Sequence, residues 1–340
     1  MKAVSKEMRT KRPTIYDVAK RAGVSPATVS RVINTPALVH SDTRQRILHA
    51  IESLQFVPKA EAVAKARQQF KRIAVLAPFF TEPSFMERLK GISQVLSSQH
   101  YELVIYAVQS NDELYAYIDM LELSKRVDGL ICLCLNLDPP LVQRINQVHF
   151  PVCCVEQKHE GLDCICIDNH EGGRMSASYL YEKGKRMPGF IGEASALCYV
   201  THSTEQRLAG FASYFQAQGI ELKHEHIWLG MNDELVSEEG ILNMLGSPLR
   251  PDCIFASSDI LAIRLVKCAL HLGLRIPDDL AVVGFDDIEI AKYVNLTTID
   301  QSLVDSGSMA AQMLRDRLRN PDRPIQTSTI TLKLSVRGSA

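Results

Sequence analysis

The sequence has no run of 18 or more apolar residues, although 46% of its 340 residues are apolar. A transmembrane helix needs about 20 such residues in succession, so we expect no membrane span. The N-terminus is polar and basic, unlike a secretory signal. We therefore expect a cytoplasmic protein, and a chain of this length favours about two or three domains over a single core.

Motifs for catalysis and metal binding are also missing. The chain contains no H-E-x-x-H, no G-x-S-x-G and no P-loop, which argues against the enzyme classes that carry these motifs. Its nine cysteines form no C-x-x-C pair, and several lie within apolar runs. Reduced, buried thiols are typical of such positions in a cytosolic protein. We expect no catalytic residues, no metal and no cofactor.

Charge is distributed unevenly along the chain. Residues 1–71 carry 14 Lys and Arg against 5 Asp and Glu, a net charge of +9. The remaining residues carry 24 against 34, a net charge of −10. A basic N-terminal module on an acidic body is typical of a nucleic-acid-binding protein with a separate second domain.

The stretch Thr14–Asn34, TIYDVAKRAGVSPATVSRVIN, predicts two short helices joined by a tight turn. Apolar residues recur at helical spacing on both sides of Gly23, which suits the left-handed end of a helix. Ser25 suits an N-cap and Pro26 the first helical position. Two helices joined in this way can form a helix-turn-helix, whose second helix enters the DNA major groove. Spacing alone would also allow a helical hairpin inside a larger core.

The residues of this stretch closely resemble the DNA-binding signature of the lactose-repressor (LacI/GalR) family of bacterial transcription regulators. The resemblance implies that Pro26, Ala27 and Arg31 read base edges, and arginine can donate two hydrogen bonds to guanine. It also implies a dimer on a pseudo-palindromic operator in double-stranded DNA. The residues placed for phosphate contacts are Tyr16, Ser25, Thr28, Ser30 and Asn34.

Around this motif we predict a flexible basic arm over residues 1–13 and a helix-turn-helix domain over 14–58. A third helix is expected at 42–54, capped by Ser41. Residues 59–72 form a linker, which in the resembled family is a hinge helix that wedges a leucine into the minor groove. Here Lys65 occupies the usual leucine position, beside Ala62 and Val63. The hinge therefore kinks DNA less, uses Val63 as the wedge, or contacts phosphate through Lys65.

From residue 73 onward, short apolar runs alternate with amphipathic helical patterns. This alternation predicts parallel, doubly wound α/β sheets, and at least eight strands indicate two lobes. The region also resembles the family's effector-binding and dimerisation domain, which is similar to type I periplasmic binding proteins. The resemblance implies lobe 1 at about 73–168 plus 302–325 and lobe 2 at about 169–299 plus 327–338. The expected crossings lie near 168–170, 298–302 and 324–328. No leucine-repeat helix follows residue 337, so we expect a dimer rather than a tetramer.

The cleft between two such lobes is the expected site of a small-molecule effector. By resemblance, Arg207 and Asp286 grip ligand hydroxyl or carboxylate groups, because each sugar hydroxyl both donates and accepts hydrogen bonds. Glu156, at a strand end, is a further acceptor. Aromatic side chains after the first strand can stack on a ring. The full set of predicted effector residues is Phe79, Phe85, Glu156, Arg207, Ser258, Asp286 and Gln301.

Two departures from the family pattern affect the predicted effector. Ser258 replaces an asparagine that is common in sugar-responsive members, and the loop 230–233 lacks their stacking aromatic. Thr201 and Ser203 replace the basic position of the purine-binding member, which argues against a purine. We predict a transcriptional regulator, a repressor of carbohydrate-utilisation genes controlled by a sugar or polyol. The alternatives are a non-sugar metabolite as effector, an enzyme using the cleft, and an exported sugar-binding receptor.

Overall fold

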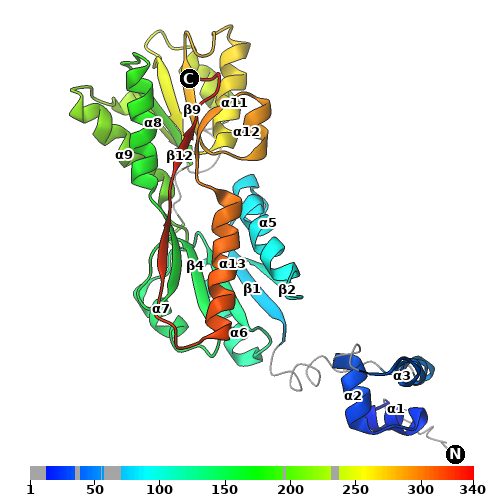
Figure 1. Cartoon of the computed structure of the whole chain (residues 1–340). Helices are drawn as coiled ribbons and strands as arrows, with labels where there is room; N and C mark the ends of the chain where they lie inside the picture. Colours follow the sequence, from blue (N-terminus) through cyan, green and yellow to red (C-terminus); the bar gives the residue numbers. More distant parts are fainter. Residues whose placement is uncertain (1–12, 35–38, 55, 57–69, 194–196, 231–236) are drawn as a thin grey trace, which may run out of the picture. The chain divides into compact units, whose positions relative to one another are not determined.

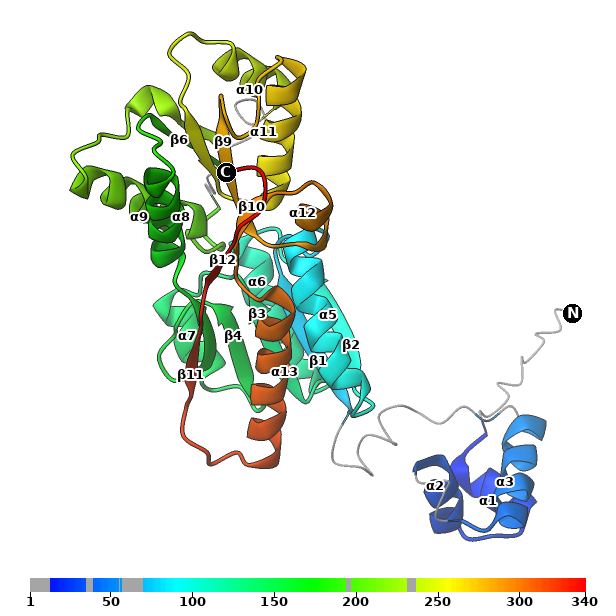
Figure 2. The same ribbon diagram turned by 45° about the horizontal axis from the view of Figure 1, so that its top comes forward.

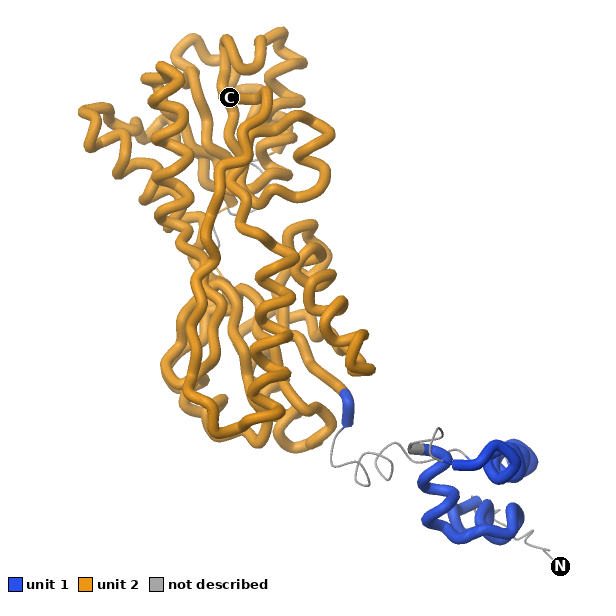
Figure 3. The backbone as a smooth tube through the Cα atoms, viewed as in Figure 1, with its two compact units in different colours: residues 1–71 blue, residues 72–340 orange. Residues whose placement is uncertain are grey.

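The structure is a computed structural model that describes all residues except 1–12, 35–38, 55, 57–69, 194–196 and 231–236. The chain divides into two compact units, residues 1–71 and 72–340 (Figure 3). The minor-groove candidates Ala62, Val63 and Lys65 lie outside the described residues, as does nearly all of the basic arm. Their roles remain predictions. No described helix is long and apolar enough to cross a membrane.

The N-terminal unit is a three-helix module. Helix α1 (Ile15–Ala22) ends at Gly23, which has the left-handed backbone (φ 67°) predicted for that position. Helix α2 (Pro26–Asn34) follows after the turn, and α3 (Ser41–Ser53) completes the module. Ser41 is the first residue of α3, and His40 precedes it as the N-cap, so the predicted serine cap is wrong by one residue. The described core of the module consists of Val18, Ala19, Ala22, Val29, Val32, Ile47 and Ala50.

The first sheet of the second unit is entirely parallel, with strand order β11-β5-β4-β3-β1-β2. Its strands are β1 (Arg72–Ala77), β2 (Glu102–Ala107), β3 (Gly129–Leu133), β4 (Val152–Glu156), β5 (Asp163–Ile167) and β11 (Thr327–Ile330). Helices α5 (Pro83–Ser97) and α13 (Leu303–Arg319) cover one face, and α6 (Asn111–Ser124) and α7 (Pro139–Ile145) cover the other (Figure 1). The strands are apolar on both sides because both faces are covered.

The second sheet has the order β12-β10-β9-β8-β6-β7 and is parallel except for β12. Its strands are β6 (Pro188–Glu193), β7 (Ile227–Gly230), β8 (Cys253–Ala256), β9 (Ala281–Asp286), β10 (Thr297–Asp300) and β12 (Lys333–Ser335). Helices α8 (Asn169–Glu182) and α9 (Ser203–Ala217) pack on one face. The remaining helices are η2 (His224–His226), α10 (Glu238–Leu245), α11 (Asp259–His271) and α12 (Glu289–Tyr293).

The chain passes between the two sheets three times (Figure 2). The passages are residue 168 between β5 and α8, residues 301–302 between β10 and α13, and residues 331–332 between β11 and β12. The third passage therefore lies later than the predicted range of 324–328. Thr327–Ile330 are the reason, because they pair with β5 and remain in the first lobe. This topology brings the carboxyl ends of β3, β4, β8 and β9 toward the boundary between the lobes.

Candidate functional site

Helix α2 presents the predicted base-reading residues on its solvent-facing side. Ala27 and Arg31 are exposed, and Pro26 is half-buried. On the opposite face, Val29 and Val32 are 0% and 4% exposed and anchor the helix in the core. With one face fixed in this way, the other projects outward as groove insertion requires.

The predicted phosphate contacts are distributed over α1, the start of α2 and the rest of α2. The Ser25 hydroxyl accepts a hydrogen bond from the Thr28 backbone N–H (3.2 Å), so Ser25 caps α2 as predicted. Tyr16 is 70% exposed on α1, Ser30 is half-buried, and Asn34 ends α2. The N-terminus of a helix favours a phosphate because of its dipole, which suits the position of Ser25 and Thr28 at the start of α2.

In the second unit, five side chains meet between the lobes, and we call them the cleft cluster. They are Arg88, Glu156, Arg207, Asp286 and Gln301, and none is more than 7% exposed. Arg88 comes from α5 and Glu156 from the end of β4, both in the first lobe. Arg207 comes from α9 and Asp286 from the end of β9 in the second lobe, while Gln301 lies in a crossing segment.

Glu156 accepts hydrogen bonds from side chains of both lobes. One carboxylate oxygen accepts from Asn169 Nδ2 (3.0 Å) and Ser203 Oγ (2.9 Å) of the second lobe. The other accepts from Arg88 Nη2 (3.0 Å) of the first lobe. The backbone of Glu156 has a φ of 96°, which a residue with a side chain rarely adopts. Such strain persists only where surrounding contacts enforce it, and it is common at functional sites.

Arg207 anchors the second lobe's side of the cluster. Its guanidinium lies over the Phe285 ring, 3.6 Å from the centroid, and donates to Asn169 Oδ1 (2.8 Å) and the Ser257 carbonyl (2.5 Å). A third guanidinium nitrogen lies 3.8 Å from the Glu156 carboxylate. Arg207 is therefore fixed in the plane needed to donate hydrogen bonds toward the cleft.

Gln301 connects the two halves of the cluster. Its Oε1 accepts from Arg88 Nη2 (2.7 Å), and its Nε2 donates to an Asp286 carboxylate oxygen. Asp286, like Glu156, has a positive φ (128°) at the end of its strand. The interaction runs from Glu156 through Arg88 and Gln301 to Asp286, so the cluster ties both lobes to a crossing segment.

The two cluster carboxyl groups differ in acidity. Burial by itself would raise the pKa of Glu156, but the charges of Arg88 and Arg207, with the bonds from Asn169 and Ser203, lower it to about 2. For Asp286, burial outweighs the attraction of the two arginines and raises the pKa to about 6. Both groups are ionised at neutral pH, and Asp286 is the first to take up a proton on acidification.

The raised pKa of Asp286 predicts how the stability of the protein depends on pH. Asp286 binds a proton more tightly when folded, so its contribution to the free energy of unfolding falls as pH rises from about 4 to 6. An asparagine at this position does not titrate, so Asp286→Asn removes this pH-dependent decrease in the free energy of unfolding. We expect the stability of Asp286→Asn relative to the wild type to increase from pH 4 to pH 7, by up to about 3 kcal/mol.

Urea unfolding followed by fluorescence of Trp228 measures this effect, because Trp228 is the single tryptophan and lies in β7 of the second lobe. Asp322→Asn, at an exposed position, is the matched control and should show no such trend. A stability difference between Asp286→Asn and the wild type that stays constant across this pH range would contradict the prediction.

Two glycines set how closely the arginine-bearing helices pack. A Cβ atom on Gly307 of α13 would lie 2.0 Å from the Arg88 carbonyl oxygen. A Cβ on Gly173 of α8 would lie 2.0 Å from the Arg207 carbonyl oxygen. Any side chain there would push the helices apart, so glycine is needed to place both arginines at the cleft.

Three predicted effector residues do not join the cleft cluster. Phe85 is 7% exposed and packs in the core under α5, and its role as a ligand contact stays a prediction. Phe79 is 39% exposed and stacks edge-on against Phe85, with centroids 6.1 Å apart. The Ser258 hydroxyl accepts from the Leu261 N–H (3.3 Å) and caps α11, which explains a serine at that position.

The predicted effector residues do not include Arg88, Asn169 or Ser203. Arg88 carried a usable signal, because it interrupts the apolar face of α5 between Phe85 and Leu89. A charged residue on a buried helical face needs a buried partner, and Glu156 is that partner. The resemblance pointed to Ser203 only as the replacement of a basic residue. Asn169 carried no comparable signal, because polar residues at helix starts usually serve as caps.

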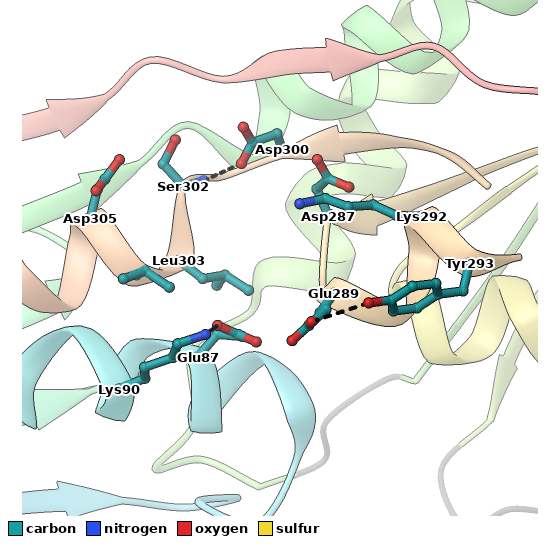
Figure 4. A pocket seen from close by; sticks show the side chains of 11 residues that line it. Glu87, Lys90, Asp287, Glu289, Lys292, Tyr293, Asp300, Ser302, Leu303 and Asp305 are labelled. Carbon is teal, nitrogen blue, oxygen red and sulfur yellow. Dashed lines mark hydrogen bonds and ion pairs between the residues drawn. The ribbon is translucent and has the colours of Figure 1, made fainter. Parts of the chain in front are cut away.

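A separate groove of about 530 Å³ lies between α12 on one side and α5 with the start of α13 on the other (Figure 4). Its lining includes five carboxylates and two lysines. Tyr293 and Glu289 both belong to α12, and their side-chain oxygens lie 3.4 Å apart on that side of the groove. None of the five cluster residues is among those that line the groove, so groove and cluster are distinct sites.

Comparison with known proteins agrees with both units. Residues 14–59 match bacterial regulatory proteins of the lacI family, and residues 177–340 match the periplasmic binding protein-like domain. The chain is 32% identical over 333 residues to the HTH-type transcriptional repressor PurR of Proteus mirabilis, covering 96% of each protein.

Solved structures show the same fold. A LacI family transcriptional regulator from Silicibacter pomeroyi is 26% identical, with a TM-score of 0.81 over 96% of this chain and 99% of that chain. The complex of the transcriptional regulator CelR with cellobiose is 27% identical, with a TM-score of 0.68 over 97% and 100%. The predicted fold class, a helix-turn-helix domain followed by a two-lobed periplasmic-binding-protein-like domain, is confirmed. The chain thus belongs to the lacI family of bacterial regulatory proteins and is a DNA-binding transcriptional regulator rather than an enzyme.

Proposed function

We propose that the protein is a repressor of carbohydrate-utilisation genes that binds a pseudo-palindromic operator as a dimer. A sugar or polyol in the cleft cluster controls its affinity for DNA. The observation that carries the DNA-binding part is the exposure of Ala27 and Arg31 on α2, whose opposite face is buried in the core. Arg31 reads a guanine through O6 and N7, and Ala27 contacts an apolar base edge such as a thymine methyl group.

The effector part rests on the chemistry of the cleft cluster. Arg88 and Arg207 donate, Glu156 and Asp286 accept, and Gln301 does both, which matches the mixed donor and acceptor character of sugar hydroxyls. A solved relative binds cellobiose. The purine-binding member of the family has a basic residue at the position of Thr201 and Ser203. Here these two hydroxyl groups are hydrogen-bonded to each other (3.0 Å), which argues against a purine effector. A non-sugar metabolite is the alternative effector.

Regulation follows from the position of the cluster between the lobes. Glu156 bonds to both lobes, so a ligand that replaces these bonds changes the relative stability of the lobe arrangements. Residues 59–72 form the hinge that transmits this change, with Ala62, Val63 and Lys65 at the minor groove. The coupling between effector and DNA is then a difference in effector affinity for two states.

Dimerisation is supported by apolar side chains that remain exposed beside the groove. Met86 of α5 is 53% exposed, and Ile290 and Tyr293 of α12 are 46% and 79% exposed. Large apolar side chains clustered at a surface are typical of protein interfaces. We propose that α5 and α12 contact their counterparts in a second copy of the chain.

The test is selection of an operator from random DNA, followed by fluorescence anisotropy at fixed salt with a panel of sugars, polyols and non-sugar metabolites. We expect a palindromic site, and one sugar or polyol that changes its affinity by about tenfold or more, equivalent to about 1.4 kcal/mol of coupling. If no sequence is enriched, the repressor proposal fails. If only a non-sugar compound alters affinity, the alternative replaces the sugar.

A further inference from the structure

The cleft cluster is electrically balanced. Arg88 and Arg207 supply two positive charges, and Glu156 and Asp286 supply two negative charges, all from residues at most 7% exposed. Buried charges are tolerated only when they are paired and hydrogen-bonded. Glu156 lies within 3.8 Å of both arginines, while Asp286 accepts a hydrogen bond from Gln301 and is attracted by the charges of Arg207 and Arg88. A ligand that enters therefore meets a site with no net charge to neutralise.

Glu156 occupies the donors that an anionic ligand would need. Its carboxylate lies among Arg88 Nη2, Asn169 Nδ2 and Ser203 Oγ at 2.9–3.0 Å. The Cys134 thiol (3.4 Å) and the Arg207 guanidinium (3.8 Å) complete the set. Guanidinium, amide and hydroxyl donors converging on one point are the usual surroundings of a bound phosphate or carboxylate. The chain thus holds an anion of its own at that point.

Arg88 retains unused capacity. Its Nη1 donates to Cys134 Sγ (3.0 Å) and its Nη2 donates to Glu156 and Gln301, but its buried Nε has no acceptor within the described part of the chain. A buried donor without an acceptor is costly, so it readily donates a hydrogen bond to a ligand oxygen. A neutral hydroxyl can supply that oxygen without approaching Glu156 as a second anion.

We infer that Glu156, with Arg88, determines the class of effector: the cleft takes uncharged polyhydroxyl compounds and rejects phosphorylated or carboxylated ones. This inference rests on the proposed binding of an effector in the cleft. An anion entering there would lie close to two carboxylates in a poorly solvated site, where repulsion is strong. Hydroxyl groups can donate to those carboxylates and accept from the arginines.

The test replaces Glu156 with glutamine and uses inorganic phosphate as the probe. Glu156→Gln leaves the shape nearly unchanged but gives the cluster a net charge of +1. We expect phosphate to bind this variant about tenfold or more tightly than the wild type, since buried charge partners interact strongly. The measurement is a phosphate titration at pH 7.5 and constant ionic strength, read from Trp228 fluorescence and from the thermal midpoint.

Two further variants locate the effect. Glu160→Gln removes the same charge from an exposed position four residues along the chain and should not gain phosphate affinity. The double variant Glu156→Gln with Arg88→Gln again has no net charge in the cluster. It should bind phosphate no more tightly than the wild type does. Far-ultraviolet circular dichroism of each variant verifies folding.

Three results would overturn the inference: a folded Glu156→Gln variant with no gain, an equal gain in Glu160→Gln, or tight phosphate binding by the wild type. The last needs no variant, so it applies even if the substitutions prevent folding. Failure of the proposed function would look different, because no compound would then change operator affinity in the wild-type protein. An anionic effector that changes operator affinity would leave the regulator proposal standing and refute this inference alone.

Discussion

Replacing Arg207 with alanine should lower the free energy of unfolding by about 3–5 kcal/mol, the usual cost of breaking a buried ion pair. The variant leaves Glu156 and Asp286 buried with Arg88 as their remaining positive neighbour. It also leaves the Asn169 amide oxygen and the Ser257 carbonyl without their donor. Most of the lost stability comes from the buried carboxylates and acceptors that no longer have a partner, since the same arginine would contribute little at an exposed site.

Urea unfolding followed by Trp228 fluorescence measures this loss in the lobe that contains α9. Arg174→Ala is the matched control, because Arg174 pairs with Glu171 on the exposed side of α8 in the same lobe. Exposed pairs contribute little, so the control should unfold close to the wild type. The free energy of unfolding of Arg207→Lys should lie between those of Arg207→Ala and the control. Lysine keeps the charge, but it neither stacks flat on Phe285 nor donates several hydrogen bonds in one plane. If Arg207→Ala is as stable as the control, water has access to the cluster and the balance of buried charges is wrong.

Replacing Arg31 with alanine should weaken binding to the selected operator by about 10- to 100-fold, since a bidentate arginine–guanine contact contributes about 1–3 kcal/mol of discrimination. Binding to random DNA should weaken only slightly, because phosphate contacts dominate non-specific affinity. Arg31 lies on the exposed face of α2, opposite the buried Val29 and Val32, so the substitution should leave the fold intact.

Anisotropy titrations at one salt concentration compare the two kinds of DNA. Arg46→Ala removes the same charge from the exposed side of α3 and serves as the control. A base-reading role requires that Arg31→Ala lose far more affinity for the operator than Arg46→Ala does. Equal losses on operator and random DNA would show that Arg31 contacts the phosphate backbone.

The local structure of the DNA-binding unit was predictable from sequence because its signals are local. Gly23, Ser25 and Pro26 each serve one turn of backbone, and each has the predicted role. The error at Ser41 is of the same local kind, since neighbouring polar residues compete for a cap. In the second unit, strands that form buried apolar runs were recognisable. Strands β10 (TTID), β11 (TSTI) and β12 (KLS) consist mostly of polar residues and were not.

The sequence by itself determined the family, the helix-turn-helix and the two-lobed α/β architecture. The motifs and the alternation of strands and helices depend only on residues close together in the chain, so they can be recognised without the tertiary structure. The sequence also pointed to Glu156, Arg207, Asp286 and Gln301, which the structure brings together in the cleft cluster. Only the tertiary structure decided that Arg88 completes their charge balance, that Phe85 belongs to the core, and that the last crossing lies at 331–332. Those facts depend on contacts between segments far apart in the chain: Arg88 and Gln301 are 213 residues apart, yet share a hydrogen bond. Local patterns cannot specify such a pairing, because it exists only once both lobes have folded and the crossing segment joins them.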